Sequence, residues 1–278
     1  MTSPRLGAPD LGVGIGLRSQ HVAQIAATRP AIDWLECISE SYLVAGGRAL
    51  AELDAVAGHY PLVLHGVSLD LGGTDPLRRD YLEKLRALVT RVKPPWASDH
   101  VCFNGAGGAH LHDLLPLPLT RAVALHVADR VRAVQDALGV RFAIENVSSY
   151  LTYRDDELPE WAFVSLIAEA ADCGILLDVN NVYVSARNHG FDADGYVDGI
   201  AHERVVQIHL AGHTDEGRYL LDTHAAPVAD PVWELYARAC RRIGPCSALI
   251  EWDDEIPALD VLLAEVARAK AVRTSVHG

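Results

Sequence analysis

Eight short apolar runs recur along this chain, and seven of them end in a carboxylate or an imidazole. The runs lie near residues 12–17, 33–38, 61–66, 96–101, 141–146, 174–179, 205–210 and 247–252. Parallel strands that are buried on both faces read as continuous apolar runs, and a closed parallel barrel gathers their C-terminal ends around one mouth. The sequence therefore predicts an α/β fold, a single-domain (β/α)8 TIM barrel, with these polar side chains gathered at the C-terminal mouth of the strands.

The segments between the runs have the apolar periodicity of helices, most clearly in 77–92 and 119–138. Glycines at 139, 174 and 244 each stand at or just before the start of a run, as in helix-to-strand connections.

Three long polar segments, 104–113, 180–191 and 212–231, are predicted to be loops on the mouth side of the barrel. We expect the barrel domain to occupy residues 1–272. The remaining residues, 273–278, are predicted to be a disordered tail.

Composition narrows the class of protein. The 278 residues, half of them apolar, fit one barrel of about 250 residues. A formal charge of -13 would repel a phosphate backbone, which makes nucleic acid a poor partner. The five cysteines form no Cys-x-x-Cys pair and suggest a reducing compartment. Because no apolar segment approaches the roughly 18 residues of a membrane helix, we expect a soluble, cytoplasmic protein.

The polar side chains that end the runs have the composition of a metal site. They are His65, His100, Glu145, Asp178, His209 and Glu251, with Glu36 as a weaker candidate. Imidazoles and carboxylates suit divalent Fe, Mn or Zn, and the missing thiolates argue against a structural zinc. Several acids in one mouth need cations, and the three lysines all lie in expected helices. The sequence therefore predicts metal ions at the mouth.

Residues that follow the runs add further candidate ligands. These are Asn180, Asn181, His213, Asp222 and His224. Asp99, Asn146 and Asp253 are candidates for orienting the imidazoles. For any one such residue, a hydrogen-bonded polar side chain without a metal is an equally good interpretation. The recurrence at seven of the eight run ends is what favours metal binding.

Several segments together resemble a known family. They are 64–69 (LHGVSL), 98–100 (SDH), 112–118 (HDLLPLP), 144–150 (IENVSSY), 177–185 (LDVNNVYVS), 208–213 (IHLAGH), 222–224 (DTH) and 250–253 (IEWD). They span nearly the whole chain and resemble the multinuclear non-haem iron-dependent oxidases, formerly a domain family of unknown function, which act in methanobactin and bufferin biosynthesis.

The resemblance implies an enzyme, a TIM barrel that holds two or three irons and uses O2 as co-substrate. Its substrate would be a residue, often Cys, of a ribosomally synthesised precursor peptide. It would work with a separate partner protein that binds the leader of that peptide.

The resemblance also implies roles for particular residues. One iron would be held by His65, His100 and Glu145, and Glu145 would bridge to a second iron held by Asp178, His209 and Glu251. A third site would use Asn181, Asp222 and His224. Catalytic roles would fall to Glu145, Asp178, His209 and Asn181.

The same ligand order resembles the trinuclear zinc barrel of endonuclease IV, except that Asn181 stands where that enzyme has a His. Because a neutral amide is a weaker ligand than an imidazole, we expect two firmly bound irons, in mixed Fe(II) and Fe(III) states, and a third that is labile or absent.

Three other functions stay open at this stage. An endonuclease IV-like metal-dependent phosphodiesterase is disfavoured by the negative charge and by Asn181. A sugar isomerase-like two-metal barrel enzyme is disfavoured because no lysine ends a strand. A non-enzymatic metal store is the third. We expect neither nucleic acid nor a membrane as a partner.

Overall fold

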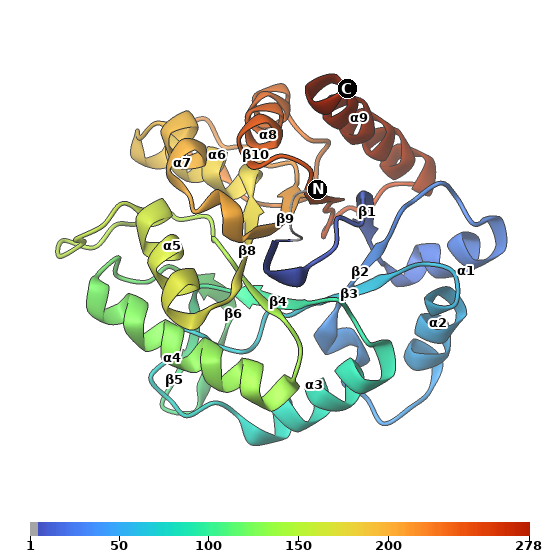
Figure 1. Cartoon of the computed structure of the whole chain (residues 1–278), viewed down its shortest axis with the longest axis horizontal. Helices are drawn as coiled ribbons and strands as arrows, with labels where there is room; N and C mark the ends of the chain where they lie inside the picture. Colours follow the sequence, from blue (N-terminus) through green and yellow to red (C-terminus); the bar gives the residue numbers. More distant parts are fainter. Residues whose placement is uncertain (1–4) are drawn as a thin grey trace.

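The computed structural model describes residues 5–278, in which eight parallel strands close into a barrel (Figure 1). The strands are β1 (Val13–Gly16), β2 (Leu35–Ile38), β3 (Leu62–His65), β4 (Ala97–His100), β7 (Phe142–Glu145), β8 (Gly174–Asp178), β9 (Val205–Leu210) and β12 (Ser247–Ile250). Each pairs in parallel with its neighbours in the order β1-β12-β9-β8-β7-β4-β3-β2. The predicted TIM barrel is confirmed, and every predicted run contains one strand.

Helices surround the strands on the outside (Figure 1). They are α1 (Ser19–Thr28), α2 (Arg48–Ala57), α3 (Arg79–Val92), α4 (Arg121–Leu138), α5 (Glu160–Ala171), α6 (Val179–His189), α7 (Ala193–Gly199), α8 (Asp230–Ile243) and α9 (Leu259–His277). Helix α4 starts after Thr120, whose hydroxyl accepts a hydrogen bond from the Val123 amide. It ends at Gly139, which takes the left-handed conformation at φ 66°. At the end of α5 this conformation falls on Asp172, and the predicted Gly174 instead begins β8.

Two predictions about the fold are wrong. Residues 180–189 are not a loop but most of helix α6, which Asp178 caps by accepting the Asn181 amide at 2.7 Å. Residues 273–277 are not a disordered tail but the last turns of α9. Arg273 anchors this end because its guanidinium donates to the carbonyls of Gly12 and Cys246, at 3.0 and 2.6 Å. The predicted domain start lies outside the described residues.

The other two predicted loops contain short hairpins. One is formed by β5 (Phe103–Ala106) with β6 (Ala109–Leu115), the other by β10 (Thr214–Asp215) with β11 (Leu220–Leu221). Both follow barrel strands and lie on the mouth side.

The interior of the barrel is built in two layers. The lower layer is a buried apolar plug of Trp34, Val63, Trp96, Ala143, Leu176, Val206 and Leu249. Gly14 allows this packing, since a Cβ there would lie 2.7 Å from the Trp34 ring. Side chains two residues apart on a strand point to the same face. Six of the seven plug residues are followed two positions later by a polar side chain, and these form a polar layer at the mouth: Glu36, His65, Ser98, Glu145, Asp178 and Glu251.

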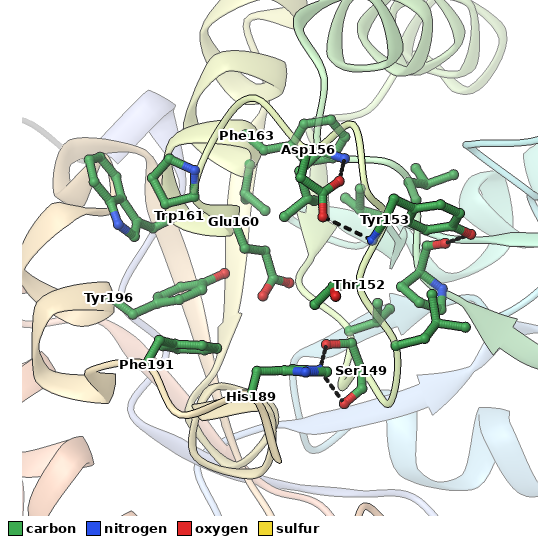
Figure 2. Close-up of a pocket in the computed structure, with 18 of the residues that line it drawn as sticks. Ser149, Thr152, Tyr153, Asp156, Glu160, Trp161, Phe163, His189, Phe191 and Tyr196 are labelled. Carbon is green, nitrogen blue, oxygen red and sulfur yellow. Dashed lines mark hydrogen bonds between the residues drawn. The ribbon is translucent and has the colours of Figure 1, made fainter. Parts of the chain in front are cut away.

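Two cavities lie on the mouth side. One, of about 500 Å³, covers the polar layer. The second, of about 530 Å³, lies between the β7–α5 loop, α5 and α7 (Figure 2). Pro116, Val147 and Leu151 line both.

Among residues 5–278, none of the helices has the length and apolar character needed to cross a membrane.

Candidate metal centre

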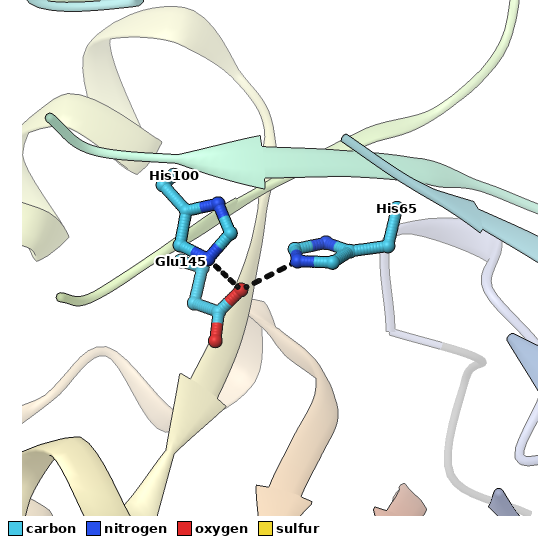
Figure 3. A group of neighbouring side chains, drawn as sticks. All are labelled: His65, His100 and Glu145. Atoms are coloured by element: carbon cyan, nitrogen blue, oxygen red, sulfur yellow. Dashed lines mark ion pairs between the residues drawn. The ribbon is translucent and has the colours of Figure 1, made fainter. Parts of the chain in front are cut away.

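The first cluster joins the ends of three strands. His65 ends β3, His100 ends β4 and Glu145 ends β7, and their ligand atoms all lie within 4.8 Å of one another. Both imidazoles direct Nε2 at the same Glu145 oxygen, Oε2, at 3.2 Å (Figure 3). The three side chains are buried. They offer two nitrogen donors and one oxygen donor to a single ion.

The second cluster shares Glu145 with the first. It contains Glu145, Asp178, His209 and Glu251, with ligand atoms again within 4.8 Å of one another. His209 Nδ1 lies 2.9 Å from Glu251 Oε2 and 3.4 Å from Glu145 Oε1. The strand register explains the proximity, because Asp178 pairs with His209 across β8 and β9, and Glu145 with His100 across β7 and β4. One carboxylate therefore lies between two potential ion positions.

Each imidazole in these two clusters is held at its other nitrogen. His65 Nδ1 lies 2.9 Å from Ser98 Oγ, and His100 Nδ1 lies 3.1 Å from the Gly66 carbonyl. His209 Nε2 lies 3.1 Å from Glu36 Oε1. A carbonyl or carboxylate can only accept, so it holds the ring proton on that nitrogen and leaves the other lone pair free. This is how metal-ligating histidines are oriented in proteins.

Glu36 is itself held in a buried network. The Gln207 amide donates to Glu36 Oε2 at 2.6 Å, and the Trp96 indole donates to Gln207 Oε1 at 2.6 Å. Gln207 Nε2 also lies 2.6 Å from His209 Nε2. This network lies below the second cluster, at the level of the apolar plug.

A third group lies around His224. His224 Nε2 faces Asp222 Oδ1 at 2.8 Å, and its Nδ1 faces Asp253 Oδ2 at 3.1 Å and Glu251 Oε2 at 3.3 Å. Asp253 is partly exposed and also pairs with Arg18. Asn181, Asp222 and His224 line the same cavity over the mouth. The two ring nitrogens of His224 thus face different acids: Nε2 faces Asp222, and Nδ1 faces Glu251 and Asp253.

Burial and the neighbouring charges set the protonation of the centre. Burial raises the pKa of the Glu145 and Asp178 carboxyls. Burial, with His100 and His209 close by, lowers the pKa of His65 well below its usual value. Burial is the largest effect on His100 and opposes its charge, but the Glu145, Asp99 and Glu251 carboxylates together outweigh it and raise the pKa of His100 to about 9. Protons and divalent cations therefore compete for the same atoms.

The arrangement of donors fits metal ions. Among the residues that the structure describes, twelve buried side-chain polar atoms lack a hydrogen-bond partner. Half of them are at this mouth. Glu145 Oε2, His209 Nδ1, His224 Nε2 and Glu251 Oε2 face an ion-pair partner, whereas Asp178 Oδ2 and Asn181 Oδ1 have neither a hydrogen bond nor an ion pair among the described residues. Leaving one such atom without a partner costs about 1–3 kcal/mol, and native proteins contain few of them. Nitrogen and oxygen donors of this kind suit Fe, Mn or Zn.

The structure brings the nine predicted ligands to one mouth. His65, His100, Glu145, Asp178, His209 and Glu251 lie in the first two clusters, and Asn181, Asp222 and His224 line the cavity above them. Glu36 contacts His209, as described above. His213 lies farther out, where its Nδ1 contacts Asn180 Oδ1 at 2.8 Å, and the Asn180 amide donates to Asp222 at 2.7 Å.

The three residues proposed to orient imidazoles behave differently from one another. Asp253 does contact His224. Asp99 instead accepts the backbone amides of His100 and Leu69, at 2.7 and 3.0 Å. Asn146 holds the backbone of Asp178 through two hydrogen bonds, at 2.9 and 3.0 Å. Asn146 therefore positions the main chain, whereas Asp99 positions the main chain and also lies beside a ring, with its Oδ1 3.8 Å from His100 Nδ1.

Sequence reasoning missed Ser98 and Gln207. Each precedes a strand-end histidine by two residues, so it points into the barrel on the same face. Both could have been found in the sequence as polar residues at a position that faces the barrel interior, two residues before a histidine.

Comparisons with known proteins identify the family of this chain. Residues 12–274 match the family model described as RiPP precursor modification enzyme MbnB/TglH/ChrH, where RiPP denotes a ribosomally synthesised and post-translationally modified peptide. A UPF0276 protein of Anaeromyxobacter sp. (strain Fw109-5) is 53% identical over 95% of this chain and 94% of its own. One from Acaryochloris marina is 49% identical over 93% of each chain.

Solved structures share the fold at low identity. A D-psicose 3-epimerase from Clostridium cellulolyticum H10 aligns with a TM-score of 0.60 at 12% identity, over 95% of this chain and 99% of its own. An IOLI protein with a bound zinc atom aligns with a TM-score of 0.62 at 11% identity, over 96% and 99%. At this identity the likeness concerns the barrel alone. The family match covers nearly the whole chain, and this protein therefore belongs to the MbnB/TglH/ChrH family of RiPP precursor modification enzymes.

Proposed function

We propose that this protein is a multinuclear non-haem iron-dependent oxidase that uses O2 to modify a residue, most simply a Cys, of a precursor peptide. A separate partner protein would bind the leader of that peptide. The observation that carries the proposal is the convergence of three imidazoles and three carboxyl groups, with the ligand atoms of each cluster within 4.8 Å of one another, at the mouth of a barrel whose family modifies peptide precursors.

The proposed ligand sets follow the observed clusters. His65, His100 and Glu145 would hold one iron, and Asp178, His209 and Glu251 would hold a second together with Glu145, which belongs to both clusters. Asn181, Asp222 and His224 would hold a third, weaker iron. Asp253 is the less suitable oxygen donor to His224, because Arg18 already pairs with it. Bound iron, in mixed Fe(II) and Fe(III) states, would supply the one-electron chemistry by which O2 oxidises the substrate.

The protein contributes positioning. Asp178 uses Oδ1 to cap helix α6, and its Oδ2 has no hydrogen-bond partner among the described residues. Asn181 likewise donates its amide to the Asn146 carbonyl at 3.1 Å, while its Oδ1 has no such partner. Each side chain is therefore fixed by one atom and presents the other to the mouth. Geometry held in this way lowers the entropy lost when ions and substrate bind.

The cavity of about 500 Å³ above these residues has room for a substrate side chain and its backbone. Its walls include Val67, Leu114, Pro116 and Leu151, which would exclude water from the reacting residue. A peptide would enter this cavity from the mouth of the barrel.

The test uses protein purified without oxygen and loaded with ferrous iron. It is mixed with the precursor peptide and the leader-binding protein encoded beside its gene, and O2 uptake and peptide mass are followed together. We expect O2 consumption coupled to a mass change on one residue, lost in Glu145→Gln and kept in the exposed control Glu234→Gln. An iron-loaded, folded protein that leaves both O2 and peptide unchanged refutes the proposal.

A further inference from the structure

The second cavity on the mouth side, of about 530 Å³, is mostly apolar and holds none of the proposed metal ligands. Aromatic side chains form much of its wall, among them Trp161, Phe163 and Phe191 (Figure 2). Its volume lies in the range of small-molecule and side-chain binding sites. The cavity is therefore large enough to take a ligand of its own.

Two polar groups face this cavity without partners. Glu160 is the first residue of α5, and no described residue gives its carboxyl group a hydrogen bond or an ion pair. Tyr196 on α7 is only 1% exposed, and its hydroxyl has no hydrogen-bond partner among the described residues. Figure 2 shows the Tyr196 hydroxyl pointing toward the Glu160 carboxyl.

The other titratable groups of the wall are already engaged. Asp156 accepts the Leu119 and Tyr153 amides at 2.7 and 3.1 Å. His189 Nε2 contacts Ser149 Oγ at 2.9 Å (Figure 2), and Asp192 caps α7. Glu160 and Tyr196 are thus the two groups left to meet a ligand.

The charge of the cavity is one-sided. No lysine or arginine is among the residues that line it, whereas three carboxyl groups are. Burial with no compensating cation raises the pKa of Glu160 to about 8. A buried carboxyl in an apolar wall is stabilised in its charged form when a cation binds beside it.

We propose that this cavity binds a basic side chain, a lysine of the precursor peptide, with its ammonium group between Glu160 and Tyr196 and its alkyl stem along the aromatic wall. A compact ammonium group matches one carboxylate and one hydroxyl, and a four-carbon stem suits apolar walls. That the lysine belongs to the precursor peptide rests on the proposed function.

The position of the cavity supports this assignment. Pro116, Val147 and Leu151 separate it from the cavity above the metal centre. A single segment, 146–159, connects the proposed ligand Glu145 to Glu160. A peptide with its reacting residue in the mouth could therefore place a neighbouring residue in the second cavity. The lysine would fix which residue of the peptide reaches the metals.

The test uses n-butylammonium as the probe and 1-butanol as its neutral counterpart of equal size. Binding of each to the full chain is measured by ligand-observed NMR titration at neutral pH. Because a charge-assisted pair is lost, Glu160→Gln should weaken the amine by about tenfold or more and leave the alcohol unchanged. Tyr196→Phe should produce a smaller loss. Glu169→Gln, an exposed site on the same helix, should change neither.

Three results overturn the proposal: no binding of the amine, equal binding of amine and alcohol, or full amine affinity in a folded Glu160→Gln protein. The probes need neither iron nor O2, so the two proposals fail separately. A protein that binds the amine but oxidises no peptide refutes the oxidase alone. An active enzyme whose amine binding ignores Glu160→Gln refutes only the lysine site.

Discussion

Glu36→Gln is the substitution that most directly tests how the centre is built. Glu36 is 1% exposed, and its Oε1 lies 3.1 Å from His209 Nε2. If Nδ1, which faces Glu145 and Glu251, binds an ion, the ring proton lies on Nε2, where the Glu36 carboxylate can accept it while the Gln207 amide donates to Glu36 Oε2. Glutamine keeps the shape and one acceptor oxygen but removes the negative charge.

The size of the effect follows from this distance. Two unit charges 3.1 Å apart attract by about 5 kcal/mol at an effective dielectric constant of about 20, which is an upper limit for the change. The Gln207 amide, which donates to Glu36 Oε2, would lose its charged acceptor as well. Loss of a partner behind a metal-ligating histidine typically lowers metal affinity 10–100-fold. We expect a loss in this range, or about 1.4–2.7 kcal/mol.

The assay is competition for Zn²⁺ or Fe²⁺ against a coloured chelator, with the number of ions per chain measured separately. The loss should fall on the site shared by Glu145, Asp178, His209 and Glu251, and spare the site of His65 and His100. Glu234→Gln, exposed on α8, removes the same charge away from the mouth and should leave both affinities unchanged. If Glu36→Gln folds normally and binds both ions within twofold of the parent protein, the tautomer argument is wrong.

Four further predictions concern the metal centre and the barrel around it. His65→Ala should remove one metal ion per chain and Glu145→Ala two, because Glu145 belongs to both clusters. Elemental analysis of the loaded proteins measures these losses, and equal losses in the two variants would contradict the prediction. Asn181→His should increase the metal retained after gel filtration, since an imidazole replaces an amide at the third site, and no gain would count against that site. Two arginines of α8 lower the pKa of Asp198, so the charged carboxylate stabilises the α7–α8 contact above its unfolded pKa, and this stabilisation is lost as pH falls through the lower folded pKa. At neutral pH, Asp198→Asn should therefore melt at a lower temperature than the parent protein. The difference between the two melting temperatures should narrow below about pH 4, and a constant difference would refute this prediction. Removing bound metal with a chelator should lower the melting temperature by several degrees, because an ion at 100 times its Kd adds about 2.7 kcal/mol to the free energy of unfolding. An unchanged melting temperature would show that bound ions do not stabilise the folded barrel.

The strands could be predicted from sequence because burial on both faces leaves a strong local signal. The runs around Leu62–His65 and Phe142–Glu145 are apolar up to their last residue, and eight such runs match the strand number of a parallel barrel. Helix α6 was missed for the opposite reason. Its first turn carries Asn180 and Asn181, which read as loop residues but are buried and held by tertiary hydrogen bonds to Asp222 and the Asn146 carbonyl.

The end of α9 shows a second limit of local reasoning. Polar residues near a chain end usually mean disorder, but Arg273 reaches the Gly12 carbonyl, a contact between residues 261 positions apart. No pattern within α9 encodes that partner.

The candidate ligands were predictable because chemistry restricts which residues may end a barrel strand, but their roles were not. Whether an acid or imidazole faces an ion or a neighbour depends on the register between strands, which fixes Asp178 beside His209. The residues behind the rings were hidden for a related reason. Ser98 and Gln207 look unremarkable in sequence until closure of the barrel puts them under a histidine.

The way these side chains share their atoms argues for ions rather than a hydrogen-bonded polar core. Asp178 and Asn181 each use one atom in a hydrogen bond with the protein, and each leaves a second buried atom without a hydrogen-bond partner among the described residues. A network selected for stability alone would satisfy both atoms, since each unsatisfied one costs about 1–3 kcal/mol. Bound water could satisfy the geometry but not the excess of buried carboxylates, which needs positive charge. Divalent cations would supply both a partner for these atoms and the positive charge that the carboxylates need. Their removal should therefore destabilise the strand ends at the mouth of the barrel.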